Sequence, residues 1–215
     1  MQRCEQNTFD QNTLTRIKKL FEVLKDIYGE IEWWRGNEFE ICIGAILAPQ
    51  TKWTKVEEAL ENLKRNGLLE PEALSKADIE RVRELIKPVN FNRQKAERII
   101  SFAKFYIKNR DAIMQLPLKE ARKLLLQLKG VGDETADSIL LYAFNRPSFV
   151  IDAYTIRILE CLKINTKRYR EAKKLFEEAI DADVKQYQLF HALIDEYAKQ
   201  YCNKKKCDEC RIKLI

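Results

Sequence analysis

The stretch Leu128-Lys129-Gly130-Val131-Gly132-Asp133-Glu134-Thr135-Ala136 decides the fold that we expect for this 215-residue chain. Two glycines flank one apolar residue, and amphipathic runs precede and follow them, which predicts a tight hairpin between two helices. Such a turn leaves the N–H groups of Gly130, Gly132 and the next helix's first turn without partners inside the helix. N–H groups presented in this way bind a phosphate without reading a base. The motif therefore predicts a hairpin that grips a nucleic-acid backbone.

The composition of the chain favours an all-helical fold. Hydrophobic residues make up 46% of the sequence and charged residues 33%, as in an ordinary globular protein, while six glycines and five prolines leave little room for all-β turns. Helix-favouring residues dominate almost every segment. We therefore expect an all-α fold of two helical lobes, with a ligand-binding cleft between them.

Apolar residues recur at three- and four-residue intervals, which is the spacing of amphipathic helices. A first helix should be capped by Asn12 or Thr13 and end before Gly29, and Thr54 suits the cap of a helix that stops at Gly67. Further helices are expected over residues 38–47, 71–74, 76–86, 92–109, 118–128, 133–144, 152–162, 169–180 and 184–201.

These helices are expected to form two domains. Residues 30–145 should form a helical barrel lobe that contains the helix–hairpin–helix at 118–144. Residues 1–29 with 146–215 should form the second lobe, which ends in a cysteine loop at 202–215.

Charge and the N-terminal sequence bear on partners and location. The net charge is +6, which is compatible with a polyanionic partner without requiring one. The first residues lack the apolar core of a signal peptide, and no run approaches the length of a transmembrane helix. We therefore expect a cytoplasmic, nucleoid-associated monomer whose six cysteines are thiols or metal ligands rather than disulfides.

Several motifs together resemble the helix–hairpin–helix DNA glycosylases of the endonuclease III type. They are the hairpin with Thr135-Ala136-Asp137, the segment Val150-Ile151-Asp152, and Gly44-Ala45-Ile46-Leu47-Ala48-Pro49-Gln50-Thr51. More narrowly, the chain is similar to the endonuclease III-related group that includes a 3-methyladenine DNA glycosylase. That similarity is carried by Trp33-Trp34, Gln50-Thr51-Lys52-Trp53, Phe91-Asn92-Arg93-Gln94-Lys95-Ala96 and Glu134-Thr135-Ala136-Asp137. The resemblance implies double-stranded DNA with a damaged base as the partner.

Asp152 matches the catalytic carboxylate of this family. Release of a base from deoxyribose passes through an oxocarbenium-like state, which a carboxylate stabilises while it orients or deprotonates the attacking water. Asp152 also precedes Ala153-Tyr154-Thr155, where an aspartate is well suited to cap a helix. Both roles can hold at once.

Glu134 is where the sequence departs from the bifunctional members of the family. Those enzymes carry, at this position, the lysine that attacks C1′ and forms a Schiff base. A carboxylate cannot form an imine, so the resemblance implies hydrolysis by water and no β-elimination. Glu134 can instead stabilise the helix start, line the pocket or position water.

Trp33, Trp34 and Trp53 are the only tryptophans of the chain. They either pack in the core or form an aromatic slot for a flipped base. Electron-rich rings favour a cationic alkylated purine.

Gln50, which follows Pro49, would fill the gap left by a flipped nucleotide, although it can equally be a surface-loop residue. Plausible phosphate contacts, for which a solvated charged face is the alternative, are Lys52, Arg93, Lys95, Lys129 and Arg157. His191, the only histidine, falls on an apolar helical face and is interpreted as structural.

Cys202, Cys207 and Cys210 resemble the family's C-terminal iron–sulfur loop, which uses four cysteines. A fourth ligand is missing from the tail, and Cys4 could supply it. A [4Fe–4S] cluster, another metal such as zinc, and a metal-free loop all stay open, and the expected chemistry needs none of them. Cys42 and Cys161 fit buried apolar positions.

The sequence thus predicts a monofunctional base-excision DNA glycosylase that flips and hydrolytically removes a damaged base, most consistently an alkylated purine such as 3-methyladenine. Two alternatives remain: a glycosylase for oxidised or mismatched bases with some lyase activity, and a non-catalytic hairpin module that only binds DNA.

Overall fold

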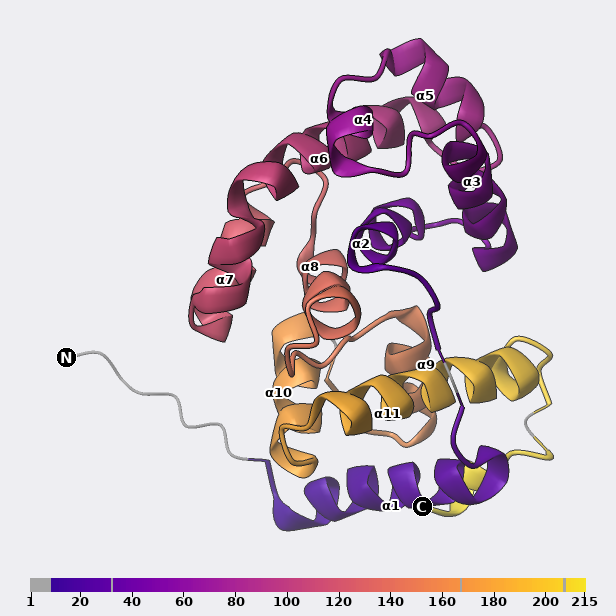
Figure 1. Ribbon diagram of the computed structural model, residues 1–215. Helices are drawn as coiled ribbons and strands as arrows, with labels where there is room; N and C mark the ends of the chain where they lie inside the picture. The colour runs from indigo at the N-terminus through magenta and orange to yellow at the C-terminus, as the bar shows by residue number, and fades with distance from the viewer. Residues whose placement is uncertain (1–8, 32, 167, 207) are drawn as a thin grey trace. The chain divides into compact units, whose positions relative to one another are not determined.

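The computed structural model describes residues 9–31, 33–166, 168–206 and 208–215, and the regular elements in these ranges are helices (Figure 1). The predicted all-α fold is therefore confirmed. The chain divides into two compact units, which we call the hairpin unit (residues 34–148) and the carboxylate unit (residues 9–33 with 149–215). Within the described ranges, no helix is long and apolar enough to cross a membrane.

The hairpin unit is built around one buried helix. Its helices are α2 (Glu38–Leu47), α3 (Trp53–Arg65), α4 (Pro71–Ser75), α5 (Ile79–Leu85), α6 (Asn92–Gln115), α7 (Leu118–Leu126), α8 (Asp133–Ser138) and the π-helix η1 (Ile139–Ala143). Helix α2 packs against α3, α6, α8 and η1, and every residue from Ile41 to Leu47 is buried. A helix that is apolar all round belongs in the centre of a unit, which explains the uninterrupted run Ile41-Cys42-Ile43-Gly44-Ala45-Ile46-Leu47.

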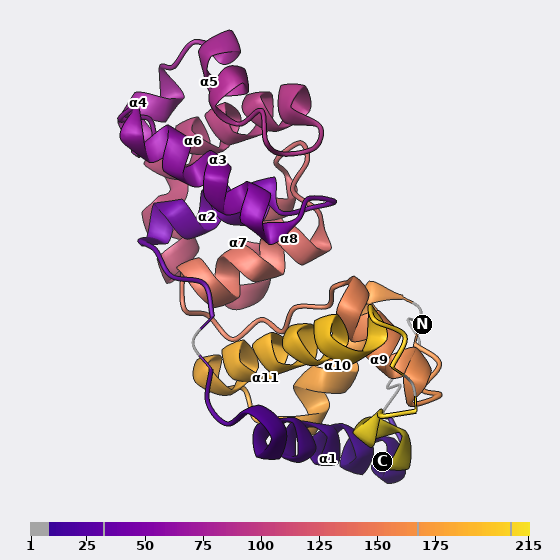
Figure 2. The same ribbon diagram turned by 90° about the vertical axis from the view of Figure 1, so that its right-hand side faces the viewer.

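The carboxylate unit combines an early segment of the described chain with its last part. It contains α1 (Gln11–Tyr28), α9 (Ala153–Cys161), α10 (Tyr169–Ala179), α11 (Val184–Tyr197), the π-helix η2 (Ala198–Cys202) and the 3₁₀-helix η3 (Arg211–Leu214). Helix α1 lies against α10 and α11 (Figure 2). Stacked phenylalanine rings fill the centre: Phe21 lies 4.6 Å from Phe190, and Phe149 lies 4.5 Å from Phe176, centroid to centroid.

Some predicted helix ends are wrong. Helix α1 is capped by Asp10 rather than by Asn12 or Thr13, because the Asp10 carboxylate accepts a 2.9 Å hydrogen bond from the Thr13 N–H. Helix α3 begins at Trp53, so Thr54 lies inside the helix and does not cap it. Helix α6 continues to Gln115 instead of ending near Asn109, because no proline occurs before Pro117.

Candidate functional site

The predicted hairpin joins α7 to α8 in the hairpin unit. Gly130 has a φ of +89°, a conformation that side chains disfavour, and Gly132 is the N-cap residue of α8. Val131 between them is buried, while Lys129, Gly130 and Gly132 are exposed. The turn thus anchors itself with one apolar side chain and presents its backbone to solvent. The first N–H groups of α8 have no acceptor within that helix.

A buried ion pair fastens the two helices of the hairpin. Arg122 on α7 donates to both carboxylate oxygens of Asp137 on α8, at 2.8 and 2.9 Å, and to Asp133 at 2.6 Å. Asp137 is fully buried and also accepts a 2.6 Å hydrogen bond from the Ser148 hydroxyl. The bond to Asp137 raises the pKa of Arg122 above its ordinary value. This network fixes the geometry of the turn between α7 and α8.

Glu134 occupies the first turn of α8, where a negative charge complements the positive end of the helix dipole. Glu134 is exposed to solvent, and its carbonyl oxygen accepts a 2.8 Å hydrogen bond from the Ser138 hydroxyl. The position is therefore accessible, and the side chain that it presents is a carboxylate.

Two of the three tryptophans meet in the hairpin unit. The rings of Trp34 and Trp53 are in edge-to-face contact with centroids 5.0 Å apart, and Tyr142 lies 5.2 Å from Trp34. Trp34 lies close against Gly44 of α2, where an added Cβ would come within 3.1 Å of the indole nitrogen. Both tryptophans remain partly exposed. Trp33 belongs to the carboxylate unit, where its ring faces the Lys199 ammonium at 4.9 Å, and its place in a common slot stays a prediction.

Tyr142 was not predicted as part of this cluster. It lies in η1, where a π-helical turn shifts the register of the side chains by one residue relative to an α-helix. The apolar periodicity of the sequence assigns residues 133–144 to one α-helix, so the direction of this ring could not be inferred from it.

Gln50 is exposed at the tip of the loop that joins α2 to α3, and its φ is +57°. The Asn90 side-chain amide donates to the Gln50 carbonyl oxygen at 2.6 Å. Behind the loop, the Lys95 ammonium donates to the carbonyl oxygens of Leu47 and Pro49, at 2.7 and 2.8 Å, and to the Thr51 hydroxyl at 2.9 Å. Burial lowers the pKa of Lys95 to about 8, and the nearby charge of Arg98 adds to the shift.

The prediction of Lys95 as a phosphate contact is wrong, because only 1% of its surface is exposed and its ammonium is enclosed by the protein's own acceptors. Lys52, Arg93 and Lys129 are exposed, and their contacts with phosphate stay predictions. Arg157 is exposed too, and it donates to the Asn203 side chain at 2.5 Å.

Phe91 is a candidate site residue that sequence reasoning passed over. It precedes α6, has a φ of +56° and exposes 56% of its surface. Its neighbour Asn90 binds the Gln50 loop, so two exposed residues in left-handed conformation come from adjoining loops. An aromatic residue next to a helix start is a weak signal, since the same pattern serves helix packing.

Asp152 is the N-cap of α9 in the carboxylate unit. Its Oδ1 atom accepts hydrogen bonds from the N–H and the hydroxyl of Thr155, at 2.7 and 2.8 Å. Its Oδ2 atom lies 3.7 Å from Nε2 of His191 on α11. One oxygen is therefore held by the helix start, and the carboxylate has a fixed orientation.

A row of polar side chains on α11 and η2 continues from this carboxylate. His191 and Asp195 are both buried and lie one helical turn apart, and Asp195 forms an ion pair with Lys199. Burial raises the pKa of Asp195. His191, interpreted from sequence as structural, thus packs in the unit beside the predicted catalytic carboxylate.

The cysteine loop is only partly described, because the predicted ligands Cys4 and Cys207 lie outside the described residues. Cys210 accepts a hydrogen bond from the Tyr197 hydroxyl at 3.4 Å, and burial together with the nearby Cys161 and Cys210 raises the pKa of Cys202 to about 11. Among the residues that the structure describes, no group of three potential ligands is arranged for a metal ion. Cys42 is buried as predicted, whereas Cys161 is exposed at the end of α9, so that prediction is wrong.

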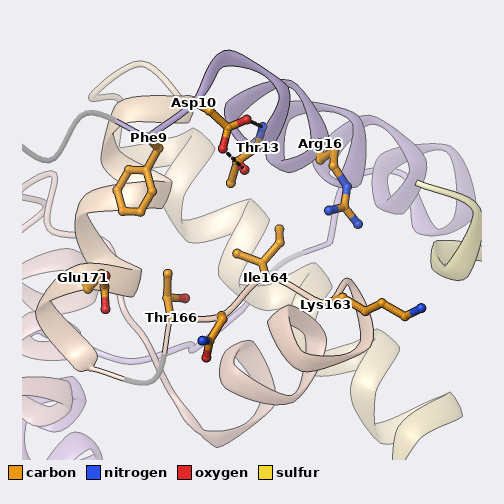
Figure 3. Close-up of a pocket in the computed structure, with 9 residues that line it drawn as sticks. Phe9, Asp10, Thr13, Arg16, Lys163, Ile164, Thr166 and Glu171 are labelled. Atoms are coloured by element: carbon orange, nitrogen blue, oxygen red, sulfur yellow. Dashed lines mark hydrogen bonds between the residues drawn. The ribbon is translucent and has the colours of Figure 1, made fainter.

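A pocket of about 350 Å³ lies elsewhere in the carboxylate unit (Figure 3). It is lined by the start of α1, residues 163–166 and Glu171, with charges of both signs. None of the predicted catalytic or DNA-binding residues lines it.

A hairpin between two helices, an aspartate that caps a helix and an aromatic cluster are the features that the resemblance to DNA glycosylases led us to expect. A family model for HhH-GPD superfamily base excision DNA repair proteins matches residues 43–182. A putative DNA repair glycosylase of Methanocaldococcus jannaschii is 41% identical over 212 residues, which cover 94% of this chain and 96% of that protein. The chain belongs to the HhH-GPD superfamily of base excision DNA repair proteins, and it is a DNA glycosylase, a hydrolase of N-glycosyl bonds.

Solved structures support the same fold. The 3-methyladenine DNA glycosylase of H. pylori, solved with 1,N6-ethenoadenine, is 28% identical, with a TM-score of 0.75 over 87% of this chain and 97% of that one. A non-covalent endonuclease III–DNA complex aligns with a TM-score of 0.79 at 19% identity, over 93% of this chain and 92% of that one.

Proposed function

We propose that this protein is a monofunctional glycosylase that releases alkylated purines such as 3-methyladenine from double-stranded DNA, with water as the nucleophile. The observation that carries the choice of substrate is the partly exposed pair of Trp34 and Trp53 beside Tyr142. The similarity to a 3-methyladenine DNA glycosylase at 28% identity supports the same choice.

DNA would be held by the hairpin. It would be opened by the loop that carries Gln50 and the loop that carries Phe91. The N–H groups at the start of α8 suit one phosphate, and Lys52, Lys129 and Arg157 would add cationic contacts that weaken with salt. Gln50 would fill the gap of the flipped nucleotide, since an amide both donates and accepts hydrogen bonds. Phe91, exposed on the loop bound to the Gln50 loop, would stack on a neighbouring base.

The aromatic cluster would select the base by charge as well as by shape. An N3- or N7-alkylated purine nucleotide is cationic, and an indole ring attracts a desolvated cation by about 2 kcal/mol or more. Alkylation also weakens the N-glycosyl bond, because the purine then leaves as a neutral molecule without being protonated first.

Asp152 would stabilise the transition state of hydrolysis. The bond between C1′ and the purine nitrogen breaks with both electrons going to the purine, and positive charge develops on the sugar. The oriented carboxylate stabilises that charge and accepts the proton of the water that adds to C1′. The products are the free base and an abasic site.

Strand cleavage is not part of this proposal. The residue two positions after Gly132 is Glu134, whose carboxylate cannot form a Schiff base with C1′. The steps above use side chains and water alone, so the cysteine loop, with a [4Fe–4S] cluster or without one, would serve the fold or the orientation of DNA.

The experiment is a substrate comparison under single-turnover conditions. Free-base release is measured from duplexes that contain 3-methyladenine, an oxidised pyrimidine, 8-oxoguanine or a T·G mismatch. We expect the alkylated purine to be released fastest. Faster release of an oxidised or mismatched base would refute the proposed specificity, and binding without release from any duplex would favour the non-catalytic module.

A further inference from the structure

Lys95 places a charged group in the interior of the hairpin unit. Its residue surface is 1% exposed, yet the ammonium is fully matched: three N–H donors meet the carbonyl oxygens of Leu47 and Pro49 and the hydroxyl of Thr51. These three acceptors bracket Gln50 in the sequence. One side chain from α6 thus holds the backbone before the residue proposed to enter DNA and the Thr51 side chain after it.

The local backbone explains why a cation is placed there. Leu47 is the last residue of α2, and the carbonyl groups at a helix end carry partial negative charge. The loop then turns through Gln50 at a φ of +57°, a strained conformation for a non-glycine residue that persists only where the surroundings impose it. A loop with exposed residues such as Gln50 has few apolar contacts to supply that constraint.

Asn90, which lies just before α6, also holds the Gln50 loop through hydrogen bonds. Its side-chain amide donates to the Gln50 carbonyl oxygen at 2.6 Å, and its N–H donates to the Thr51 hydroxyl at 3.2 Å. The Thr51 hydroxyl is therefore shared by Lys95 and Asn90. Residues 47, 49, 50 and 51 thus each accept a hydrogen bond from Lys95 or Asn90, which lie five positions apart in sequence.

We propose that Lys95 is a positioning residue that presets the 48–51 loop, so that Gln50 is held ready to enter the DNA duplex. The proposal rests on the proposed role of Gln50 in base extrusion. Lys95 itself touches neither the base nor the phosphates, since its ammonium is enclosed by the loop. Its loss should therefore slow extrusion of the damaged base and leave the hydrolytic step of an extruded base unchanged.

The test uses Lys95→Met, which keeps the length of the side chain and removes the donors. Lys104→Met is the matched control, because Lys104 is an exposed lysine on the same helix. Amide exchange of residues 48–52 in the free protein reports the loop, and fluorescence of 2-aminopurine next to the lesion reports extrusion. We expect faster exchange in this loop and extrusion slowed by up to about 100-fold, the loss that a misplacement of about 1 Å can cause. Lys104→Met should match the wild type.

A double-mutant cycle with Gln50→Ala distinguishes the positioning role of Lys95 from the extrusion role of Gln50. If Lys95 acts through Gln50, adding Lys95→Met to Gln50→Ala causes no further loss of extrusion rate. Full multiplication of the two losses, or unchanged loop exchange in Lys95→Met, would overturn the positioning role. Wild-type extrusion by Gln50→Ala would overturn the proposed role of Gln50, whatever the loop exchange shows.

Thr51→Val covers the case in which Lys95→Met does not fold. It removes one of the three acceptors of Lys95, together with the acceptor of the Asn90 N–H, and leaves the two carbonyl contacts of Lys95 and the Asn90–Gln50 contact in place. A smaller increase in loop exchange, with slowed extrusion and an unchanged circular dichroism spectrum, supports the proposal. Wild-type exchange and extrusion in this variant would overturn it.

Discussion

Asp137→Asn is the perturbation for which the structure gives the clearest magnitude. The wild-type carboxylate is fully buried and accepts two hydrogen bonds from Arg122 and one from the Ser148 hydroxyl. An asparagine keeps one oxygen and turns an NH₂ group toward a donor. Arg122, whose side chain is 15% exposed, then keeps Asp133 as its remaining carboxylate partner in this network.

Breaking a buried ion pair by removing one partner costs about 3–5 kcal/mol. Because Asp133 keeps a 2.6 Å contact with Arg122, we expect the lower end of that range, about 3 kcal/mol, as the loss in free energy of unfolding. The control is Glu80→Gln, which removes the exposed pair between Glu80 and Arg83 at 3.1 Å. Exposed pairs contribute about 0–1 kcal/mol, so this variant should change little.

The assay is urea unfolding in a Trp33→Phe background, followed by tryptophan fluorescence. The remaining tryptophans, Trp34 and Trp53, both belong to the hairpin unit, so the signal reports the unit that contains the mutation. An unchanged slope with a lower midpoint would show a loss of stability rather than a change in unfolding behaviour. A loss below about 1 kcal/mol, equal to that of the exposed-pair control, would refute the fastening role of Asp137.

Three further predictions concern the site. Asp152→Asn should abolish release of 3-methyladenine while its affinity for abasic DNA, measured by fluorescence anisotropy, stays within about threefold of the wild type; retained release would remove Asp152 from the catalytic role. Trp53→Ala should weaken capture of the alkylated base by about 1–3 kcal/mol, which is the value of one base–aromatic stack. The measurement is the substrate concentration at the half-maximal single-turnover rate. An unchanged concentration would contradict the aromatic slot. The pKa of Lys95 is lowered from 10.5 to about 8 by burial, so between these pH values the unfolded chain binds a proton that the folded chain lacks. The free energy of unfolding of the wild type should therefore rise with pH relative to Lys95→Met in this window, as measured by urea titrations at pH 7.5 and 10; a flat or falling difference would contradict the burial of the charge.

Local signals explain why much of the fold could be predicted. The two glycines around Val131 define a turn within a few residues, and the run from Ile41 to Leu47 defines a buried helix that begins and ends where the sequence indicated. Asp152 was predicted both as a helix cap and as the catalytic residue, and the structure shows the cap. The turn, the buried helix and the helix cap depend on neighbouring residues alone, whereas the catalytic assignment of Asp152 rests on the resemblance to the family.

The features that sequence reasoning missed depend on residues far apart in the chain. Lys95 looked like a phosphate contact because lysines are usually exposed, and only the return of the loop at residues 47–51 supplies acceptors that bury it. Tyr142 reaches Trp34 through a π-helical turn that the apolar pattern does not encode. Cys161 was expected in the core, but it ends α9 at an exposed position.

Whether water or an amine of the protein attacks C1′ is tested by release of 3-methyladenine with borohydride present in a parallel reaction. We predict stoichiometric release of the free base, an abasic product that stays intact until alkali is added, and no protein–DNA adduct after reduction. A borohydride-stable adduct would contradict it, because the adduct would show that an amine of the protein, and not water, attacks C1′.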